Sequence, residues 1–362
     1  MPVEPSTPPP TTPSSLGAVF GGGTRVHVDT KLPSHFLSRV GLGDNRLPRR
    51  VELSFLPHGL TPSPHDARLM VLFEKHGPGG CVVDLVDGRV VHTLTAGPGR
   101  EFYGHGVFSK DGSLLFCTET VVGDGFRGVI AVRDGKDFSD RGEFPSFGVA
   151  PHDCMLDPSG DVLVVANGGS PVGSDRPAPN VAYVDVATQT LLDAVEPSNP
   201  RINTGHIAMT AAGEIAVVSA PRAGLQADTC IGGVSVRGRG GALQTITSPS
   251  EVVDALVGET LSVAIHEPTR TVAATTPLAH YLTFWDLDSG ALKGSLRVPN
   301  PRGVAVTLAE DAFIVNYGNP PKAAHVDVKT LRPMNEGEAR HGVASACTGS
   351  HILVADLPGW GE

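Results

Sequence analysis

One sequence pattern recurs seven times along the chain, and this repeat constrains the fold more than any other feature. Each unit begins with a His-Gly-like pair, continues as an apolar strand, turns at Asp-Gly or an equivalent, and ends in a second apolar strand with a polar last residue. The units begin at His58, His105, His152, His206, Ser262, Arg302 and His341. These starts are 39 to 56 residues apart, which is typical of four-stranded propeller blades.

The sequence therefore predicts an all-β fold, a single seven-bladed β-propeller over residues 17–362. Most units are followed by a second pair of strands with alternating apolar residues, for example over residues 80–96 and 281–297. The seventh unit ends at Asp356 with two strands only, so we expect N-terminal strands near residues 25–31 and 50–57 to complete and close the last blade. Closure removes exposed sheet edges. Residues 32–49 are predicted to be a long loop without an assigned role, and Gly21–Gly23 to be a loop. Two β-sandwich domains would explain the recurring start less well.

Composition narrows the possible partners. Gly 44 and Pro 31 favour short elements joined by tight turns. A net charge of −10 without a basic run argues against nucleic acid as a partner. No apolar stretch approaches the roughly 18 residues of a membrane span. The five cysteines are odd in number and widely spaced, which argues against a disulfide framework.

The N-terminal segment, residues 1–16, is rich in Pro, Ser and Thr and is predicted to be a disordered tail. It lacks a basic segment followed by an apolar one, so no export signal is visible. From these features we expect a cytoplasmic protein, most simply a monomer.

The repeat places its recurring polar residues in two rings at one mouth of the central channel. The first strand of each blade lines the channel, and the antiparallel second strand returns to the same mouth. The inner ring contains the seven unit starts named above. The second ring contains the last residues of the second strands: Glu74, Glu119, Asn167, Ser219, Thr275, Asn316 and Asp356.

Histidines that converge on one axis favour a metal site. Protonated imidazoles would repel one another, and neutral ones would need hydrogen-bond partners in a narrow channel. Neutral imidazole is a common ligand of transition metals, and polar neighbours would fix its tautomer. The predicted metal ligands are His58, His105, His152, His206 and His341. The predicted supporting residues are Glu74, Asn167, Asn316 and Asp356. Two residues are predicted to be catalytic: Glu119, which would orient a histidine, and Arg302, which would bind an anionic substrate.

Three other readings of these residues stay open at this point. Each histidine could only complete backbone hydrogen bonds at a turn, or the ring could bind an anion through Arg302 and protonated histidines. Cys154 could add a soft ligand because it lies two residues after His152. The remaining histidines that we expect at the surface are His65, His76, His92, His266 and His351.

Three segments carry a family resemblance. Residues 102–119 (FYGHGVFSKDGSLLFCTE), 127–134 (RGVIAVRD) and 142–169 (GEFPSFGVAPHDCMLDPSGDVLVVANGG) resemble an uncharacterised family of bacterial propeller proteins. Members of that family are typically exported, often by the twin-arginine route. They are often encoded beside imelysin-type iron-uptake proteins and di-haem oxidoreductases. The resemblance implies an iron- or copper-related role and a periplasmic location, although the expected export signal is not visible here.

These observations favour a metal-binding propeller that uses Fe(II) or copper, either as a redox enzyme or as a metal-handling protein. Its partner would be a small-molecule substrate or a protein that donates or accepts metal. The first alternative is a propeller that binds a protein partner without catalysis. The second is a lactonase-like hydrolase, which the ligand set disfavours because Ca²⁺ and Mg²⁺ prefer oxygen ligands to imidazole.

Overall fold

The computed structural model describes residues 16–42, 48–225, 230–334 and 347–359. Over these residues the regular structure is almost entirely β, which confirms the predicted all-β class. It contains strands β1 to β27, one short helix α1 (Ser250–Val253) and one 3-10 turn η1 (Val122–Asp124). None of its helices is long and apolar enough to cross a membrane.

The strands follow one another in antiparallel groups, each built from consecutive segments of the chain. The first two groups join into one larger sheet because β5 also pairs with β8. The first group is β4 (Pro57–Pro62), β5 (Leu69–Gly77), β6 (Gly79–Asp84) and β7 (Arg89–Thr95). The second is β8 (Arg100–Phe108), β9 (Leu114–Val121), β10 (Arg127–Asp134) and β11 (Asp140–Val149).

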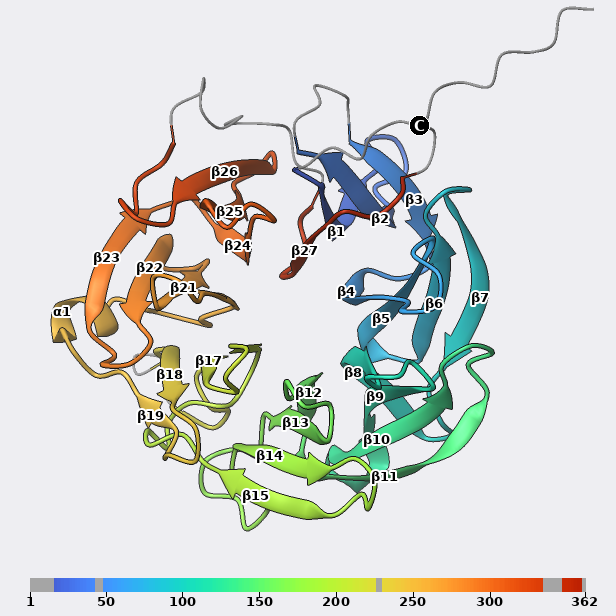
Figure 1. Ribbon diagram of the computed structural model, residues 1–362, viewed down its shortest axis with the longest axis horizontal. Helices are drawn as coiled ribbons and strands as arrows, with labels where there is room; N and C mark the ends of the chain where they lie inside the picture. The colour runs from blue at the N-terminus through green and yellow to red at the C-terminus, as the bar shows by residue number, and fades with distance from the viewer. Residues whose placement is uncertain (1–15, 43–47, 226–229, 335–346, 360–362) are drawn as a thin grey trace, which may run out of the picture.

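Four further groups continue the pattern. The next two are β12 (Pro151–Leu156), β13 (Val162–Asn167), β14 (Asn180–Asp185) and β15 (Leu191–Val195), then β16 (Ile207–Met209), β17 (Ile215–Ser219), β18 (Gly233–Arg237) and β19 (Gln244–Thr245). The last two are β20 (Ser262–His266), β21 (Thr271–Thr276), β22 (Tyr281–Asp286) and β23 (Leu292–Arg297), then β24 (Pro301–Val306), β25 (Ala312–Tyr317) and β26 (Lys322–Asp327). Figure 1 shows the groups around a common centre, with β4, β12 and β24 close to it.

The remaining sheet combines the two ends of the chain. It has the order β27-β1-β2-β3, built from β1 (Ala18–Val26), β2 (Pro33–Gly41), β3 (Arg49–Leu53) and β27 (Ile352–Ala355). The pairing of β1 with β27 runs from Ala18 opposite Ala355 to Gly21 opposite Ile352. Within the described residues the N-terminal segment contributes three strands to this sheet, one more than expected, and the C-terminal segment contributes β27.

Two predictions about the N-terminal segment are wrong. Residues 33–41 form strand β2, so most of the expected loop is sheet, and residues 28–30 form the turn between β1 and β2. The glycine triplet lies inside β1. An added Cβ at Gly22 would lie 2.2 Å from the Pro57 carbonyl oxygen, so the close approach of two backbones requires glycine there.

Apolar side chains from neighbouring sheets fill the space between the groups. For example, Val218 of β17 belongs to one cluster with Trp285 of β22. Cys81, Cys117 and Cys154 are free and buried, as small apolar residues in this core, and Cys347 is buried as well. Residues 1–15 of the predicted tail and His341 lie outside the described residues.

Candidate metal centre

Four of the predicted histidines meet near the centre of the ring. His58 comes from β4, His105 from β8 and His152 from β12, whereas His206 directly precedes β16. One ring nitrogen of each lies within 4.8 Å of a ring nitrogen of each of the others. Four successive strand groups therefore direct one imidazole each to the same point, as the repeat predicts.

A fifth imidazole joins them, and it belongs to His351. Its Nε2 lies 2.6 Å from His206 Nε2, and its ring centroid is 4.6 Å from that of His58 and 4.7 Å from that of His105. His351 directly precedes β27, as His206 precedes β16. The expectation of a surface position for His351 is therefore wrong. We name His58, His105, His152, His206 and His351 the histidine cluster.

Irregular pairing at the strand starts directs three of these side chains inward. The register between first and second strands shifts at His58, His105 and His152. Such β-bulges re-aim a side chain and are common beside functional sites. Close backbone approach is also needed, because an added Cβ at Gly59 would lie 2.3 Å from the Gly104 carbonyl oxygen.

Hydrogen bonding fixes the tautomer of His206. Its Nδ1 lies 2.5 Å from the carbonyl oxygen of Leu261, which can only accept, so Nδ1 carries the proton. In the neutral ring Nε2 then has one lone pair. That nitrogen has three imidazole Nε2 neighbours, at 2.7 Å (His152), 2.6 Å (His351) and 3.3 Å (His58). One lone pair cannot accept three hydrogen bonds, so contacts within the cluster do not satisfy all four nitrogens.

In His105 and His58 a polar group of the protein lies beside Nδ1: a carboxylate, which can only accept, at His105, and a hydroxyl, which can accept or donate, at His58. His105 Nδ1 lies 3.3 Å from Asp153 Oδ1, and its buried Nε2 has no hydrogen-bond partner in the described part of the chain. Ser350 Oγ lies 3.1 Å from His58 Nδ1. A metal ligand needs this arrangement, because an acceptor at one ring nitrogen fixes the tautomer and the orientation of the other.

Electrostatics keeps the cluster neutral. Burial lowers the pKa of all five imidazoles, and well below the usual value in His58, His152, His206 and His351. The positive charge of Lys75 lowers the pKa of each ring further, and Arg302 adds to this effect at His351. Neutral imidazoles have the lone pairs that a metal requires, so binding an anion through protonated histidines is disfavoured.

The predicted second ring does not touch the imidazoles. Glu119 forms an ion pair with Arg100 at 2.8 Å, and Glu74 accepts a hydrogen bond from the Gly79 amide at 2.9 Å. Asn167 binds Ser146, Asn316 donates to the Cys347 carbonyl, and Asp356 is exposed. The expectation assumed regular pairing, but the bulge places Pro57 rather than His58 opposite Glu74. Asp153, Ser350 and the Leu261 carbonyl hold the rings instead.

The structure also places three other residues that the sequence analysis singled out. Arg302 is half-buried near His351, and its Nε donates to the Gly349 carbonyl at 3.4 Å. Cys154 packs in the apolar core of its sheet, where burial raises the pKa of its thiol well above the usual value, so no soft ligand comes from it. His266, expected at the surface, is buried and binds Thr269 and Glu310.

Replacing Asp153 by asparagine is expected to weaken metal binding by about 10- to 100-fold, as loss of an outer partner of a ligating histidine typically does. The Asp153 carboxylate faces His105 Nδ1 and is also bound by the backbone amides of Cys154 and Ile207. Competition with a chelator of known affinity measures the change. Asp157→Asn, at the other end of β12, is the control. Equal weakening in both variants would contradict the assignment of Asp153.

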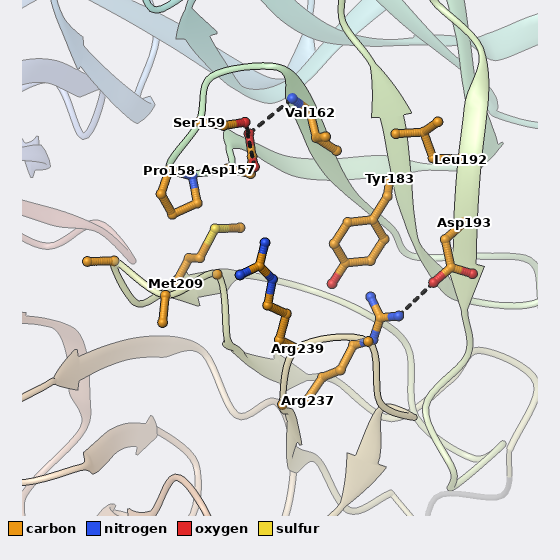
Figure 2. Close-up of a pocket in the computed structure, with 15 residues that line it drawn as sticks. Asp157, Pro158, Ser159, Val162, Tyr183, Leu192, Asp193, Met209, Arg237 and Arg239 are labelled. Atoms are coloured by element: carbon orange, nitrogen blue, oxygen red, sulfur yellow. Dashed lines mark hydrogen bonds and ion pairs between the residues drawn. The ribbon is translucent and has the colours of Figure 1, made fainter.

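A separate cavity of about 400 Å³ lies at the opposite ends of the strands that follow His152 and His206 (Figure 2). Its charged groups are largely paired: Arg237 donates to Asp193 at 2.6 Å and lies over the ring of Tyr183. Asp157 accepts hydrogen bonds from its own turn. No histidine lines this cavity, so it offers none of the metal chemistry of the cluster.

Comparisons with known proteins agree with this architecture. Residues 51–343 match the model of a family described as "Protein of unknown function (DUF1513)". Among solved structures, hydrazine synthase of Kuenenia stuttgartiensis is similar with a TM-score of 0.65 at 13% identity, covering 90% of this chain and 99% of that one. The periplasmic gluconolactonase of Pseudomonas aeruginosa gives 0.62 at 17% identity, covering 94% and 99%. At such identities the likeness concerns the propeller-like fold alone. No curated protein matches the sequence.

Proposed function

The chain belongs to this family of proteins of unknown function, and we propose that it is a metal-binding propeller whose histidine cluster holds iron or copper. The observation that carries the proposal is the convergence of imidazole nitrogens whose other ring nitrogens are already engaged. Residues 17–362 would form one domain of seven blades, closed by the pairing of β1 with β27. The redox or metal-handling role expected from the sequence is part of the same proposal.

The residues fit a transition metal by three criteria. The donor set is nitrogen alone, which suits iron, copper and zinc better than Ca²⁺ or Mg²⁺. The buried Nε2 of His105 has no partner among the described residues and gains one when a metal binds. Finally, the lowered pKa values leave the rings neutral at physiological pH.

Each residue has a distinct task in this proposal. His58, His105, His152 and His206 bind the metal, and His351 adds a fifth nitrogen or occupies the edge of the site. A bound iron or copper ion would supply one-electron chemistry or reversible metal transfer. Leu261, Asp153 and Ser350 hold the rings in register. Lys75 and Arg302 would attract an anionic substrate, whereas a role for Glu119 beside the metal has no supporting contact.

The two alternatives receive less support. A lactonase-like hydrolase with a hard cation would need oxygen ligands, and the cluster presents nitrogen. If the propeller only bound a protein partner, replacing the cluster histidines by alanine should leave its function unchanged. The metal content of the protein separates these alternatives from the proposal.

The test is elemental analysis of protein purified without chelator or nickel affinity, beside His105→Ala/His152→Ala. We expect about one equivalent of iron or copper in the wild type, and less than a tenth of that in the variant. His92→Ala, an exposed histidine of β7, is the control and should retain the metal. An absence of metal in the wild type, with no uptake of Fe(II), Cu(I) or Cu(II), would overturn the proposal.

A further inference from the structure

A cavity beside the cluster has the size of a small-molecule site. It encloses about 310 Å³ and includes His152 among its lining residues, together with Lys75, His76, Tyr103 and Glu259. Glycine backbone at positions 168, 169 and 205 completes part of the wall. Small-molecule sites typically range from about 300 to 1,000 Å³, so this one suits a ligand of few heavy atoms.

The pairing of β5 with β8 brings two of these side chains together. Lys75 lies directly opposite Tyr103 in this pairing, and the register shifts immediately afterwards. His76 sits in the shift with a φ of 60°, a left-handed conformation that is uncommon for histidine. Its ring meets that of Tyr103 edge-on at 4.5 Å. A strained residue held by its surroundings is typical of functional sites.

Two polar groups of this cavity have no protein partner among the described residues. Within the described ranges, neither the Lys75 ammonium nor the Tyr103 hydroxyl has a hydrogen bond or ion pair with another residue, although both side chains are largely buried. A tyrosine hydroxyl can donate a hydrogen bond to a carboxylate. By contrast, Arg222, which also lines the cavity, donates to the carbonyls of Ser170 and Pro200, so part of its hydrogen-bonding capacity is used while its positive charge remains.

The charges in and beside this cavity select the ligand. Lys75 and Arg302 are positive, and Glu259 acts electrostatically on both of them. A metal bound by neutral imidazoles would add further positive charge. An anion is therefore favoured. A second negative charge on the ligand would meet the carboxylate of Glu259, so a monoanion is favoured over a dianion.

We propose that this cavity binds a small organic monocarboxylate, whose carboxylate is held by the Lys75 ammonium and the Tyr103 hydroxyl. This inference deepens the proposed function and rests on it for one point: the carboxylate would place the rest of the ligand beside the metal at His152. Binding of the carboxylate itself needs only the two donors. The cavity and the metal centre can therefore be tested separately.

The experiment is calorimetric titration of propionate into wild-type protein and Lys75→Met, each with and without metal, with the metal content measured in every sample. Propionamide tests whether the negative charge of the ligand is needed, since it has nearly the same shape as propionate but is neutral. Succinate and inorganic phosphate test whether a doubly charged anion binds better. Lys110→Met, an exposed lysine that donates to the Ser159 carbonyl, is the control.

We expect propionate to bind at least tenfold more weakly to Lys75→Met than to wild type and to Lys110→Met, at unchanged metal content and melting temperature. Tyr103→Phe should weaken binding less. Equal binding to wild type and Lys75→Met, or tighter binding of propionamide, succinate or phosphate, would overturn the inference. Metal without propionate binding overturns this inference alone. Lysine-dependent propionate binding in a protein that takes up no metal overturns the proposed function and supports the cavity.

Discussion

His206→Ala should abolish tight metal binding, because His206 Nε2 lies close to the Nε2 atoms of three other imidazoles of the cluster. Its Nε2 lies within 3.3 Å of Nε2 of His58, His152 and His351. Removal of a ligating ring should cost more than the roughly 10- to 100-fold typical of an outer partner. Metal titration against a competing chelator measures the loss.

The matched control for this variant is His266→Ala. His266 is also a buried histidine, but its two ring nitrogens contact Thr269 and Glu310 in a different part of the ring of sheets. The control reproduces the cost of emptying a buried imidazole site without removing a ligand. Unchanged affinity in His206→Ala, or an equal loss in both variants, would contradict a metal site at the cluster.

The metal-free protein should lose stability as the pH falls from about 7 to 5.5. Burial lowers the pKa of the cluster imidazoles in the folded state, while an unfolded histidine titrates near 6.5. Below pH 6.5 the unfolded chain therefore binds protons that the folded protein does not, and the free energy of unfolding decreases. Above pH 6.5 both states are neutral and the contribution is constant. Each imidazole contributes a decrease in the free energy of unfolding of up to about 1.4 kcal/mol per pH unit.

Denaturant unfolding at pH 7.5, 6.5 and 5.5 measures this dependence. Carboxylates with a lowered pKa, such as Asp134, contribute little in that window, because they lose their stabilising effect only at lower pH. Burial raises the pKa of Glu119, so the comparison with a histidine variant is needed to isolate the imidazoles. The variant His105→Ala/His206→Ala should show a shallower dependence over the same range. Stability that is constant or increases on acidification, or an equal slope in the variant, would contradict neutral buried rings.

The sequence repeat predicted the positions of four cluster histidines, because a side chain that begins the inner strand of a sheet faces the centre. It did not identify His351, and His341 lies outside the described residues. His341 resembles the other starts in being followed by Gly-Val, whereas His351 is followed by isoleucine and lacks that signal. A repeat does not reveal how many strands each end contributes. Comparison of His351 before β27 with His206 before β16 would have been the clue.

The supporting residues were missed for a different reason. Regular antiparallel pairing places Glu74 opposite His58, but a bulge shifts the pairing by one residue, and bulges have no reliable sequence signature. Asp153 could have been suspected, because it is a carboxylate adjacent to a predicted ligand. Leu261 acts through its backbone carbonyl, and no side-chain pattern identifies that role. Lys75 lies on a second strand and comes to the centre only through the pairing of β5 with β8.

The most direct test of the central claim is X-ray absorption spectroscopy of the metal-loaded protein. We expect a first shell of nitrogen with the outer-shell scattering of about four imidazole rings, and a loss of ring scattering in His206→Ala. A first shell that contains sulfur, or oxygen ligands without imidazole scattering, would contradict metal binding by the histidine cluster.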